Sequence, residues 1–394
     1  MPVFAAAKAV AERADEMTFL TLSDIHFDPF ISCHNAVPCS LIQKLNAASY
    51  EKWPLIFKAN AKDAPEYRQD SNYTLLTSAL VAAKKTADAR RVKFVIILGD
   101  FLGHEFRDHY KKYAKDNSFA GYQAFVEKNM AFLTDEIAHT FPHIDVYNVV
   151  GNNDSYNRDY ISVPKGAFFE DISSMWAGLI KTKANRAALL KDFPIGGYYA
   201  VNAPGDPGLR LIVLNSVLFS YKATAKKNDQ AAMEQLKWLH QELQLAHDKN
   251  QKVIIAMHIP PAIDIYATLK VRFFRLVDLW KLNFTKLFED DLKEYAPEMV
   301  GILSGHLHSD WSQVLTLDDE HSISISGTTS ISPIFGNNPG FKVFTYSIKK
   351  RQLEHADAYV YPMDKKSTWS ILYRHNQMAP SNLQTVRKQL VQNE

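Results

Sequence analysis

The chain has 394 residues, of which 46% are hydrophobic and 22% are charged, and its formal net charge is +2 at pH 7. Single hydrophobic cores usually stop growing at about 250–300 residues, so we expect one large sandwich with appendages or two domains. The near-balanced charge gives no argument for specific nucleic-acid binding or for an acidic membrane surface. No stretch approaches the ~20 apolar residues that cross a bilayer, so no transmembrane segment is expected.

The first part of the chain predicts alternating strands and helices. Residues 1–16 alternate alanine with charged residues and predict a loose helical lead-in. Strand and helix patterns then alternate to about residue 260, which favours an α/β layered fold. Residues 72–90 carry a helical apolar face with basic residues late, as a helix C-terminus prefers. Asp229 is a good N-cap for a helix that runs to residue 247.

The second part of the chain changes character. Residues 264–296 are rich in aromatic side chains and predict an inserted pair of helices that walls the cleft. Residues 314–317, 322–326 and 342–348 predict strands separated by turns. Residues 363–394 return to a helical pattern, so we expect a helical extension packed on the outside.

Five short motifs carry residues of metal-binding type, and each follows a run that predicts a buried strand. The motif residues are Asp24 and His26 after residues 19–22, Asp100 after 94–98, Asn152 after 146–150, His258 after 253–257, and His306 and His308 after 300–303. Loops at the carboxyl ends of strands converge on one crevice, so we expect these side chains to meet there. A single histidine is ordinarily structural, but the joint pattern predicts a two-metal site of the kind that promotes in-line displacement at phosphorus.

The order of these motifs resembles that of the calcineurin-like metallophosphoesterases: Asp-x-His, Gly-Asp, Gly-Asn-x-Asp, His and Gly-His-x-His. Further residues resemble the acid sphingomyelinase-like phosphodiesterase branch of that family. They include Asp28-Pro29, His104 four residues after Asp100, His258-Ile259-Pro260-Pro261 and Asn338-Pro339-Gly340-Phe341. The resemblance covers roughly residues 17–362 and implies a catalytic domain there, with two facing mixed β-sheets flanked by helices.

The resemblance also implies which residues bind two metal ions. The implied ligands are Asp24, His26, His308 and Asp100 for the first ion, and Asn152, His258, His306 and Asp100 for the second. Asp100 suits the shared position because a carboxylate offers two oxygens to two cations. His306 and His308 alternate by two, so in an extended segment both would face one side. Such ligands suit zinc, manganese or iron, and the branch implies zinc.

One motif departs from the family pattern. The residue after Asn152 is usually a histidine that contacts the phosphate and can serve as an acid, but here it is Asn153. An amide can donate a hydrogen bond to a phosphoryl oxygen but cannot deliver a proton. The Gly-Asn-Asn-Asp spelling resembles the endopolyphosphatase relatives of the branch, so the site need not be inactive. His104 becomes the expected proton donor, with a surface role beside Glu105 as the alternative. Asp154 either orients an imidazole or caps its turn.

The two cysteines, Cys33 and Cys39, lie in one loop after the first motif. They are either free thiols in a reducing cytosol or a local disulfide in an oxidising compartment, and their shared loop favours the disulfide. We therefore expect a secreted or otherwise extracytoplasmic protein, with the cytoplasm as the alternative. The first residues show no basic stretch followed by an apolar run, which is the pattern of a signal peptide. A chain whose leader has been removed would look the same.

Together these features predict a binuclear metal-dependent phosphoric ester hydrolase. The resemblance implies an acid sphingomyelinase-like phosphodiesterase in which metal-bound hydroxide attacks phosphorus in line. The alternatives are a nucleotide or inorganic polyphosphate hydrolase on the same site, and a non-catalytic binding module that kept the fold. Such modules tend to lose ligands, whereas every ligand position is filled here. The expected substrates are small-molecule or lipid phosphodiesters, nucleotides or polyphosphate.

Overall fold

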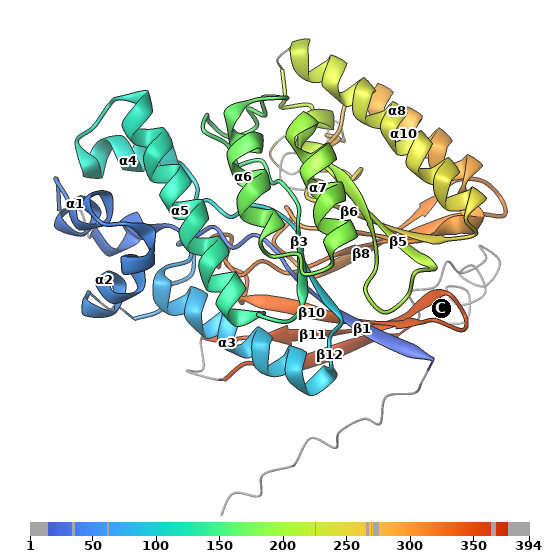
Figure 1. Ribbon diagram of the computed structural model, residues 1–394, viewed down its shortest axis with the longest axis horizontal. Coiled ribbons are helices and arrows are strands. Elements are labelled where there is room, and N and C mark those ends of the chain that lie inside the picture. The colour runs from blue at the N-terminus through green and yellow to red at the C-terminus, as the bar shows by residue number, and fades with distance from the viewer. Residues whose placement is uncertain are drawn as a thin grey trace, which may run out of the picture.

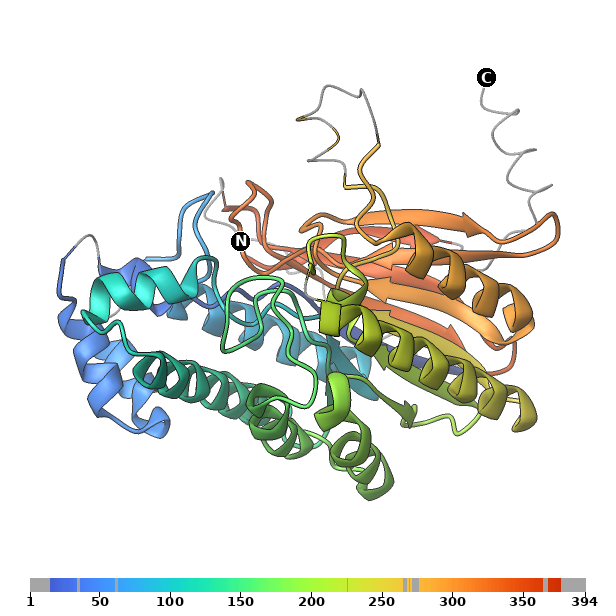
Figure 2. The ribbon, with the colours of Figure 1, turned by 90° about the horizontal axis from the view of Figure 1, so that it is seen from above.

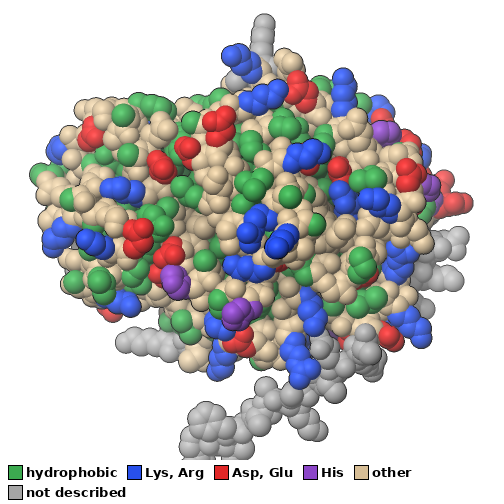
Figure 3. All heavy atoms as spheres, viewed as in Figure 1, with side chains coloured by type: hydrophobic (Ala, Val, Ile, Leu, Met, Phe, Trp, Pro, Cys, Tyr) green, Lys and Arg blue, Asp and Glu red, His purple; other side chains and the backbone are tan. Residues whose placement is uncertain are grey.

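The computed structural model describes residues 15–33, 36–60, 63–224, 226–264, 268, 270, 276–363 and 368–376. Within them, two six-stranded sheets face each other and helices cover the outside (Figures 1 and 2). This confirms the expected pair of mixed sheets flanked by helices. None of the helices in these ranges is long and apolar enough to pass through a bilayer. Acidic and basic side chains are interspersed over the face shown in Figure 3.

The first sheet has the strand order β12-β11-β10-β1-β2-β3. Its strands are β1 (Glu16–Leu22), β2 (Phe94–Ile97), β3 (Asp145–Asn148), β10 (Gly340–Ser347), β11 (Gln352–Val360) and β12 (Ser370–Asn376). β1, β2 and β3 run parallel, whereas β10, β11 and β12 continue the sheet antiparallel. β2 and β3 are buried throughout, as expected for parallel strands covered on both faces. The carboxyl ends of β1, β2 and β3 therefore lie at one edge.

The second sheet has the strand order β4-β5-β6-β7-β9-β8. Its strands are β4 (Tyr199–Asn202), β5 (Leu209–Leu214), β6 (Lys252–Met257), β7 (Met299–Ser304), β8 (Trp311–Thr316) and β9 (Ser322–Gly327). β5, β6, β7 and β9 run parallel, and β4 and β8 are antiparallel edge strands. The loops after β6 and β7 carry the histidine motifs, so both sheets contribute strand ends to one site.

The helices form two groups, one on each sheet. They are α1 (Ser40–Ala47), α2 (Trp53–Ala59), α3 (Tyr73–Arg90), α4 (Phe106–Ala114), α5 (Phe119–Thr140), α6 (Ala167–Ala177), α7 (Lys183–Gly196), α8 (Lys226–Asp248) and α10 (Leu282–Glu294). Short 3-10 helices span Pro29–Cys33, Tyr50–Lys52, Ser216–Phe219 and Ala296–Glu298. On the second sheet, Leu239 of α8 and Phe288 of α10 share a buried cluster with Ile255 of β6. The other large cluster joins the remaining helices to the first sheet and fills the space between the sheets.

Local signals account for where α3 begins and ends. The side chain of Asn72 accepts a hydrogen bond from the backbone N–H of Leu75 at 3.0 Å, which caps the first turn. Arg91 adopts the left-handed conformation with φ +50° and ends the helix. The helix expected over residues 72–90 is therefore present with these bounds.

The structure corrects several expected helical segments. Residues 370–376 form β12, so a helix there is wrong; the open edge of β11 offers backbone partners that outweigh helical propensity. The rest of the expected 363–394 extension lies mostly outside the described residues, as do residues 1–14 of the lead-in, and Glu16 already begins β1. α8 begins at Lys226 rather than after Asp229. Within 264–296, α10 is the long described helix, and part of the expected pair is undescribed.

Candidate metal centre

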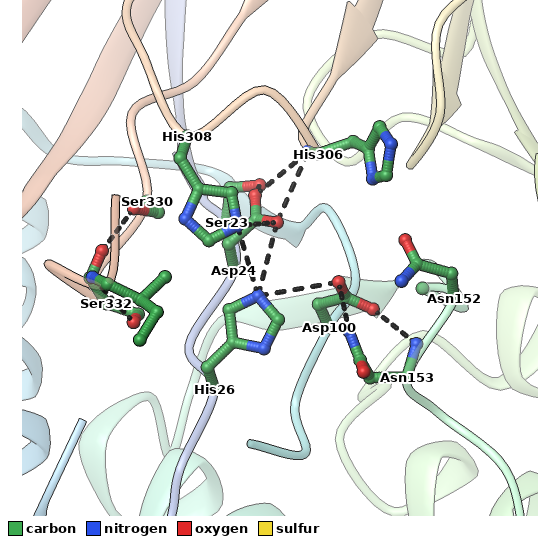
Figure 4. Close-up of polar contacts among 12 residues, drawn as sticks. Ser23, Asp24, His26, Asp100, Asn152, Asn153, His306, His308, Ser330 and Ser332 are labelled. Atoms are coloured by element: carbon green, nitrogen blue, oxygen red, sulfur yellow. Dashed lines mark hydrogen bonds and ion pairs between the residues drawn. The ribbon is translucent and has the colours of Figure 1, made fainter. Parts of the chain in front are cut away.

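The seven expected ligands lie together where the carboxyl ends of the two sheets meet. Asp24, His26 and His308 are turned toward one another, and Asp100 lies between His26 and Asn152 (Figure 4). All seven side chains are buried except for that of His306, which is partly exposed. The contributing loops follow β1, β2, β3, β6 and β7, as the sequence pattern predicts.

The backbone of these loops is bent sharply at the motif residues. Positive φ angles occur at Asp24 (+49°), His26 (+42°), Asp100 (+56°), His306 (+68°) and His308 (+56°). His306 and His308 would face one side only in an extended segment, and that expectation does not apply here because both residues are in the left-handed region. Such conformations cost about 1–3 kcal/mol each and cluster at functional sites, where they aim side chains that an extended strand would point elsewhere.

Two motif glycines leave room for this crowding. A Cβ atom on Gly151 would lie 2.1 Å from Oδ1 of Asp100 and 2.2 Å from its backbone nitrogen. A Cβ atom on Gly99 would lie 2.8 Å from Nδ1 of His258, and Gly99 has φ +92°. A side chain at either position would push the motif loops apart. This explains why glycine precedes Asp100 and Asn152.

The first group of ligands surrounds Asp24. Nε2 of His308 lies 3.2 Å from Oδ1 of Asp24, and Nε2 of His26 lies 3.7 Å from the same oxygen. The two imidazole nitrogens are 3.2 Å apart. Nε2 of His26 is also 3.4 Å from Oδ2 of Asp100, which joins this group to the next one.

The second group of ligands surrounds His258. Its Nε2 lies 3.2 Å from Oδ2 of Asp100 and 3.0 Å from Oδ1 of Asn152. Ligand atoms of Asp100, His258 and His306 lie within 4.8 Å of one another. Asp100 therefore belongs to both groups, as a bridging carboxylate would.

Buried negative charge dominates the electrostatics of the site. Burial raises the pKa of the Asp24 and Asp100 carboxyls, but the neighbouring histidines hold both pKa values well below the ordinary range. Burial opposes the charged form of His26 and His258, yet the carboxylates raise their pKa values to about 10 and about 9. Burial and the neighbouring His258 lower the pKa of His306 to about 3. The two carboxylates thus draw positive charge to their shared space, and divalent cations would supply it.

The spacing and chemistry of the donors fit such cations. Ligand atoms at ~2.1 Å from a tetrahedral zinc lie about 3.4 Å apart. The separations of 3.2 to 3.7 Å around Asp24 and His26 match that value. Imidazole nitrogen with carboxylate and amide oxygen suits zinc, manganese or iron. The donor set therefore fits two divalent cations that share Asp100.

A second layer of contacts orients the ligands. Nδ1 of His26 lies 2.9 Å from the carbonyl oxygen of Leu102, and Nδ1 of His258 lies 2.7 Å from that of Leu98. Each contact fixes a tautomer that turns Nε2 into the site. Nδ2 of Asn152 donates to Oδ1 of Asp159 at 2.6 Å, which leaves the amide oxygen of Asn152 facing His258.

Asp154 holds the loop that carries Asp100. Its carboxylate accepts hydrogen bonds from the backbone N–H groups of Asp100, Phe101, Leu102 and Gly151 at 2.8–3.2 Å. It contacts no imidazole in these bonds, so the turn-capping alternative describes Asp154. The hydrogen bonds tie the loop after β2 to the loop after β3, and so fix the position of the shared ligand relative to Asn152.

His104 lies beside the first group and is held by a carboxylate. Its ring stacks on His26 with centroids 4.1 Å apart, and ring nitrogens of His26, His104 and His308 lie within 4.8 Å of one another. Nδ1 of His104 lies 3.0 Å from Oδ1 of Asp70, and its backbone N–H donates to Oδ2 at 2.7 Å. Burial raises the pKa of Asp70, but the His104 hydrogen bond lowers it to about 2, so Asp70 stays ionised.

His104 and Asn153 also line a cavity of about 800 Å³. Asn153 was expected to face a phosphoryl oxygen, but in this structure its side-chain amide donates to Oδ2 of Asp100 at 2.9 Å. Its backbone N–H donates to Oδ1 of the same carboxylate at 2.8 Å. Asn153 therefore braces the shared carboxylate from the cavity side.

Sequence reasoning missed Asp70 and Asp159. Asp70 lies just before the N-cap of α3, and no motif marks it. Asp159 lies seven residues after Asn152 and reaches its amide only because the chain turns back at the site. A carboxylate close in sequence to a ligand motif is a weak signal that could have suggested Asp159, but Asp70 and His104 are 34 residues apart.

The structure joins Cys33 and Cys39 in a disulfide. Cys33 ends the short helix Pro29–Cys33, and Cys39 precedes α1. Both side chains are buried in the core next to the first motif. The bridge therefore ties the loop that follows Asp24 and His26 to the helical layer.

Comparison with known proteins agrees with this geometry. Residues 17–310 match the calcineurin-like phosphoesterase family. The chain belongs to this family and is a phosphoesterase.

Two curated relatives illustrate the branch. The cyclic GMP-AMP phosphodiesterase SMPDL3A of Bos taurus is 23% identical over 340 residues, covering 81% of this chain and 70% of that protein. The sphingomyelinase phosphodiesterase C of Dictyostelium discoideum is 25% identical over 309 residues, covering 74% of this chain and 62% of that protein. These matches confirm the resemblance to acid sphingomyelinase-like phosphodiesterases.

A solved structure confirms the fold. The crystal structure of a dimetal phosphatase from Danio rerio matches with a TM-score of 0.51 at 13% sequence identity. The match covers 90% of this chain and 98% of that one. At this identity the likeness supports the architecture alone, and the site must be judged from its own residues.

Proposed function

We propose that this phosphoesterase is a binuclear metal phosphodiesterase. The observation that carries the proposal is the pair of ligand groups that share Asp100 beside the His104–Asp70 pair. Asp24, His26 and His308 would hold one cation with Asp100, and the second group would hold the other. Two such cations neutralise phosphate charge and lower the pKa of a water to ~7. Zinc is the proposed metal, with manganese or iron as alternatives.

The chain's own residues then have distinct tasks. His104 donates a proton to the departing oxygen, and Asp70 keeps its ring in place through Nδ1. Asn153 holds the carboxylate of Asp100 at both oxygens and lines the cavity, where its amide could also donate to a phosphoryl oxygen. Asp154 keeps the loop of Asp100 fixed.

A nucleotide or polyphosphate hydrolase on the same site is the second candidate. Three arginines, Arg68, Arg107 and Arg158, line the cavity, and guanidinium groups suit phosphate oxygens. The relatives named above act on cyclic GMP-AMP or carry sphingomyelinase in their names, so both nucleotide and lipid diesters belong in a test. A non-catalytic module is disfavoured because no ligand position is lost.

A substrate panel tests the proposal. Purified protein loaded with zinc, manganese or magnesium is assayed on bis(4-nitrophenyl) phosphate, nucleotides, polyphosphate and sphingomyelin. We expect diester turnover that disappears with chelation and returns with metal. If the protein binds two metal ions per chain and still hydrolyses no phosphodiester with any of these metals, the proposed activity is wrong.

We also propose an extracytoplasmic location. The disulfide between Cys33 and Cys39 supports it, because structural disulfides persist in oxidising compartments and are rare in the cytosol. The cytoplasm remains the alternative, and fractionation of expressing cells with an antibody to the protein decides between them.

A further inference from the structure

A tyrosine and a lysine stand beside the second ligand group, and neither has a task in the mechanism above. The hydroxyl of Tyr160 lies 3.4 Å from Nε2 of His306. Nζ of Lys222 donates to that hydroxyl at 3.2 Å. The backbone N–H of Tyr160 donates to the carbonyl oxygen of Asn152 at 3.0 Å. Tyr160 is thus tied to the two ligands that flank the second cation position.

Lys222 is held in place although its side chain is exposed. Its ammonium lies 4.8 Å from the ring centre of Tyr160 and 5.8 Å from that of Tyr221. The backbone N–H of Tyr221 donates to the carbonyl oxygen of Leu279 at 3.2 Å, which anchors the loop. These contacts keep the ammonium beside the second ligand group.

His306, the Tyr160 hydroxyl and the Lys222 ammonium are joined in that order by the two polar contacts. A phosphoryl oxygen bound beside Nε2 of His306 comes within hydrogen-bond reach of the Tyr160 hydroxyl. Lys222 lies one hydrogen bond further out, so its charge reaches the next group along the substrate. His104 lies beside the first ligand group instead, so that next group is a substituent that stays on the phosphorus.

We propose that Tyr160 and Lys222 form an anion subsite that selects substrates whose reacting phosphorus carries a further phosphate as its non-leaving substituent. The inference rests on the proposed function, because it assigns an orientation to a substrate at that centre. Tyr160 binds the reacting phosphoryl group and Lys222 binds the neighbouring phosphate. Water oxygen bonds to phosphorus as the bond to the leaving oxygen breaks. The leaving oxygen takes the proton from His104, the proton that the attacking water releases restores His104 at the end of the turnover, and the further phosphate stays attached.

The subsite also disfavours a choline substituent there. A quaternary ammonium is usually recognised over the face of an aromatic ring. The ammonium of Lys222 lies 4.8 Å from the ring centre of Tyr160 and repels a second positive charge there. Phosphoanhydrides therefore fit this end of the site better than phosphocholine esters.

Three nitrophenyl esters with the same leaving group test the subsite. They are bis(4-nitrophenyl) phosphate, nitrophenylphosphorylcholine and the terminal nitrophenyl ester of a nucleoside triphosphate. In Lys222→Gln we expect kcat/KM to fall about tenfold on the triphosphate ester, the loss of one charge-assisted hydrogen bond. It should change less than about twofold on the bis ester and rise on the choline ester. Lys222→Glu should enlarge this pattern, and Tyr160→Phe should lower all three alike.

Lys84→Gln is the matched control, since Lys84 is a surface lysine on α3 paired with Asp88. An equal fall on all three esters in Lys222→Gln, or no fall on the triphosphate ester, overturns the subsite. If the wild type turns over none of the esters, the proposed function fails and binding decides the subsite. Calorimetry of the metal-loaded protein then compares methylenediphosphonate with methylphosphonate. Affinity that falls in Lys222→Gln for the diphosphonate but not for the methylphosphonate supports the subsite. Unchanged affinity for both compounds overturns the subsite.

Discussion

The two sheets bring different chemistry to the candidate metal centre. Loops of the first sheet supply both carboxylates, Asp24 and Asp100, and the amide of Asn152. Loops of the second sheet supply only imidazoles. The negative charge of the candidate centre therefore comes from one sheet, and the second sheet would complete the coordination with ligands that are neutral when metal-bound.

This division makes the centre depend on how the sheets are joined. The backbone N–H of His306 in the second sheet donates to the Asp24 carboxylate at 3.1 Å. Nζ of the buried Lys342 on β10 donates to the carbonyl oxygen of Gly327 on β9 at 2.7 Å and pairs with Asp310 at 2.6 Å. Substitution of a first-sheet carboxylate should remove negative charge from the centre. Substitution of a second-sheet histidine should remove one neutral ligand.

Metal content should reveal this difference most strongly. Asp100→Asn removes the shared carboxylate, so we expect both cations to be lost. His258→Ala removes one imidazole from the second group, so we expect about one cation to remain. The loss of activity in Asp100→Asn should exceed the ~10–100-fold that outer-shell partners cost. Elemental analysis and diester turnover measure both.

Asp88→Asn is the matched control, because it removes an exposed carboxylate on α3 that pairs with Lys84. Two cations retained in Asp100→Asn would show that Asp100 does not bridge. One cation or none in active wild-type protein would remove the binuclear centre altogether.

The next effect concerns the proton donor on the side of the first sheet. General acid catalysis typically contributes ~10²–10⁴-fold. His104→Ala should lose that much on an alkyl ester, whose alkoxide leaves poorly, and far less on a nitrophenyl diester. Metal content should stay intact. Asn153→Ala should lower turnover of both esters alike, because Asn153 holds Asp100 and carries no transferable proton.

His109→Ala is the control for this test, since His109 lines the same cavity and pairs with Asp28 at 3.2 Å. It should show no dependence on the leaving group. Equal losses on both esters in His104→Ala would mean that His104 binds phosphate and that another group supplies the proton.

Asp70→Asn should give a smaller version of the same pattern. The amide can still contact Nδ1 of His104 through oxygen, but it no longer carries charge, and its contact with Ser332 Oγ is neutral. We expect about a tenfold loss on the alkyl ester and little on the nitrophenyl diester, because a charged hydrogen bond is replaced by a neutral one. A uniform loss on both esters would indicate a structural role for Asp70.

The sequence predicts the fold class and the five strands that precede the motifs well because both depend on local patterns. Each motif follows a short apolar run, and each run forms a strand within three residues of the expected bounds. β12 escapes prediction because a strand at residues 370–376 is stabilised by the edge of β11, which is a partner that local propensity does not contain.

The residues that support the site are harder to predict. Asp70 contacts His104 across the fold, and Lys222 lies 62 residues from Tyr160. Their positions follow from tertiary packing and not from spacing along the chain. The left-handed backbone at His306 and His308 escapes prediction for a related reason: the strain is sustained by surrounding contacts such as the bond to Asp24.

The smallest expected effect concerns the disulfide in the first-sheet half. A bridge across six residues closes a short loop, so the entropy model gives only about 2–3 kcal/mol. Cys33→Ser with Cys39→Ser should therefore lower the free energy of unfolding modestly. Because the bridge follows Asp24 and His26, the affinity of the first cation should fall more than that of the second. Chemical denaturation and metal titration measure these effects, and thiol counting under denaturing, non-reducing conditions establishes the bridge. Two free thiols in protein from an oxidising compartment would contradict it, and equal weakening of both cations would show that the loop does not distinguish the two halves.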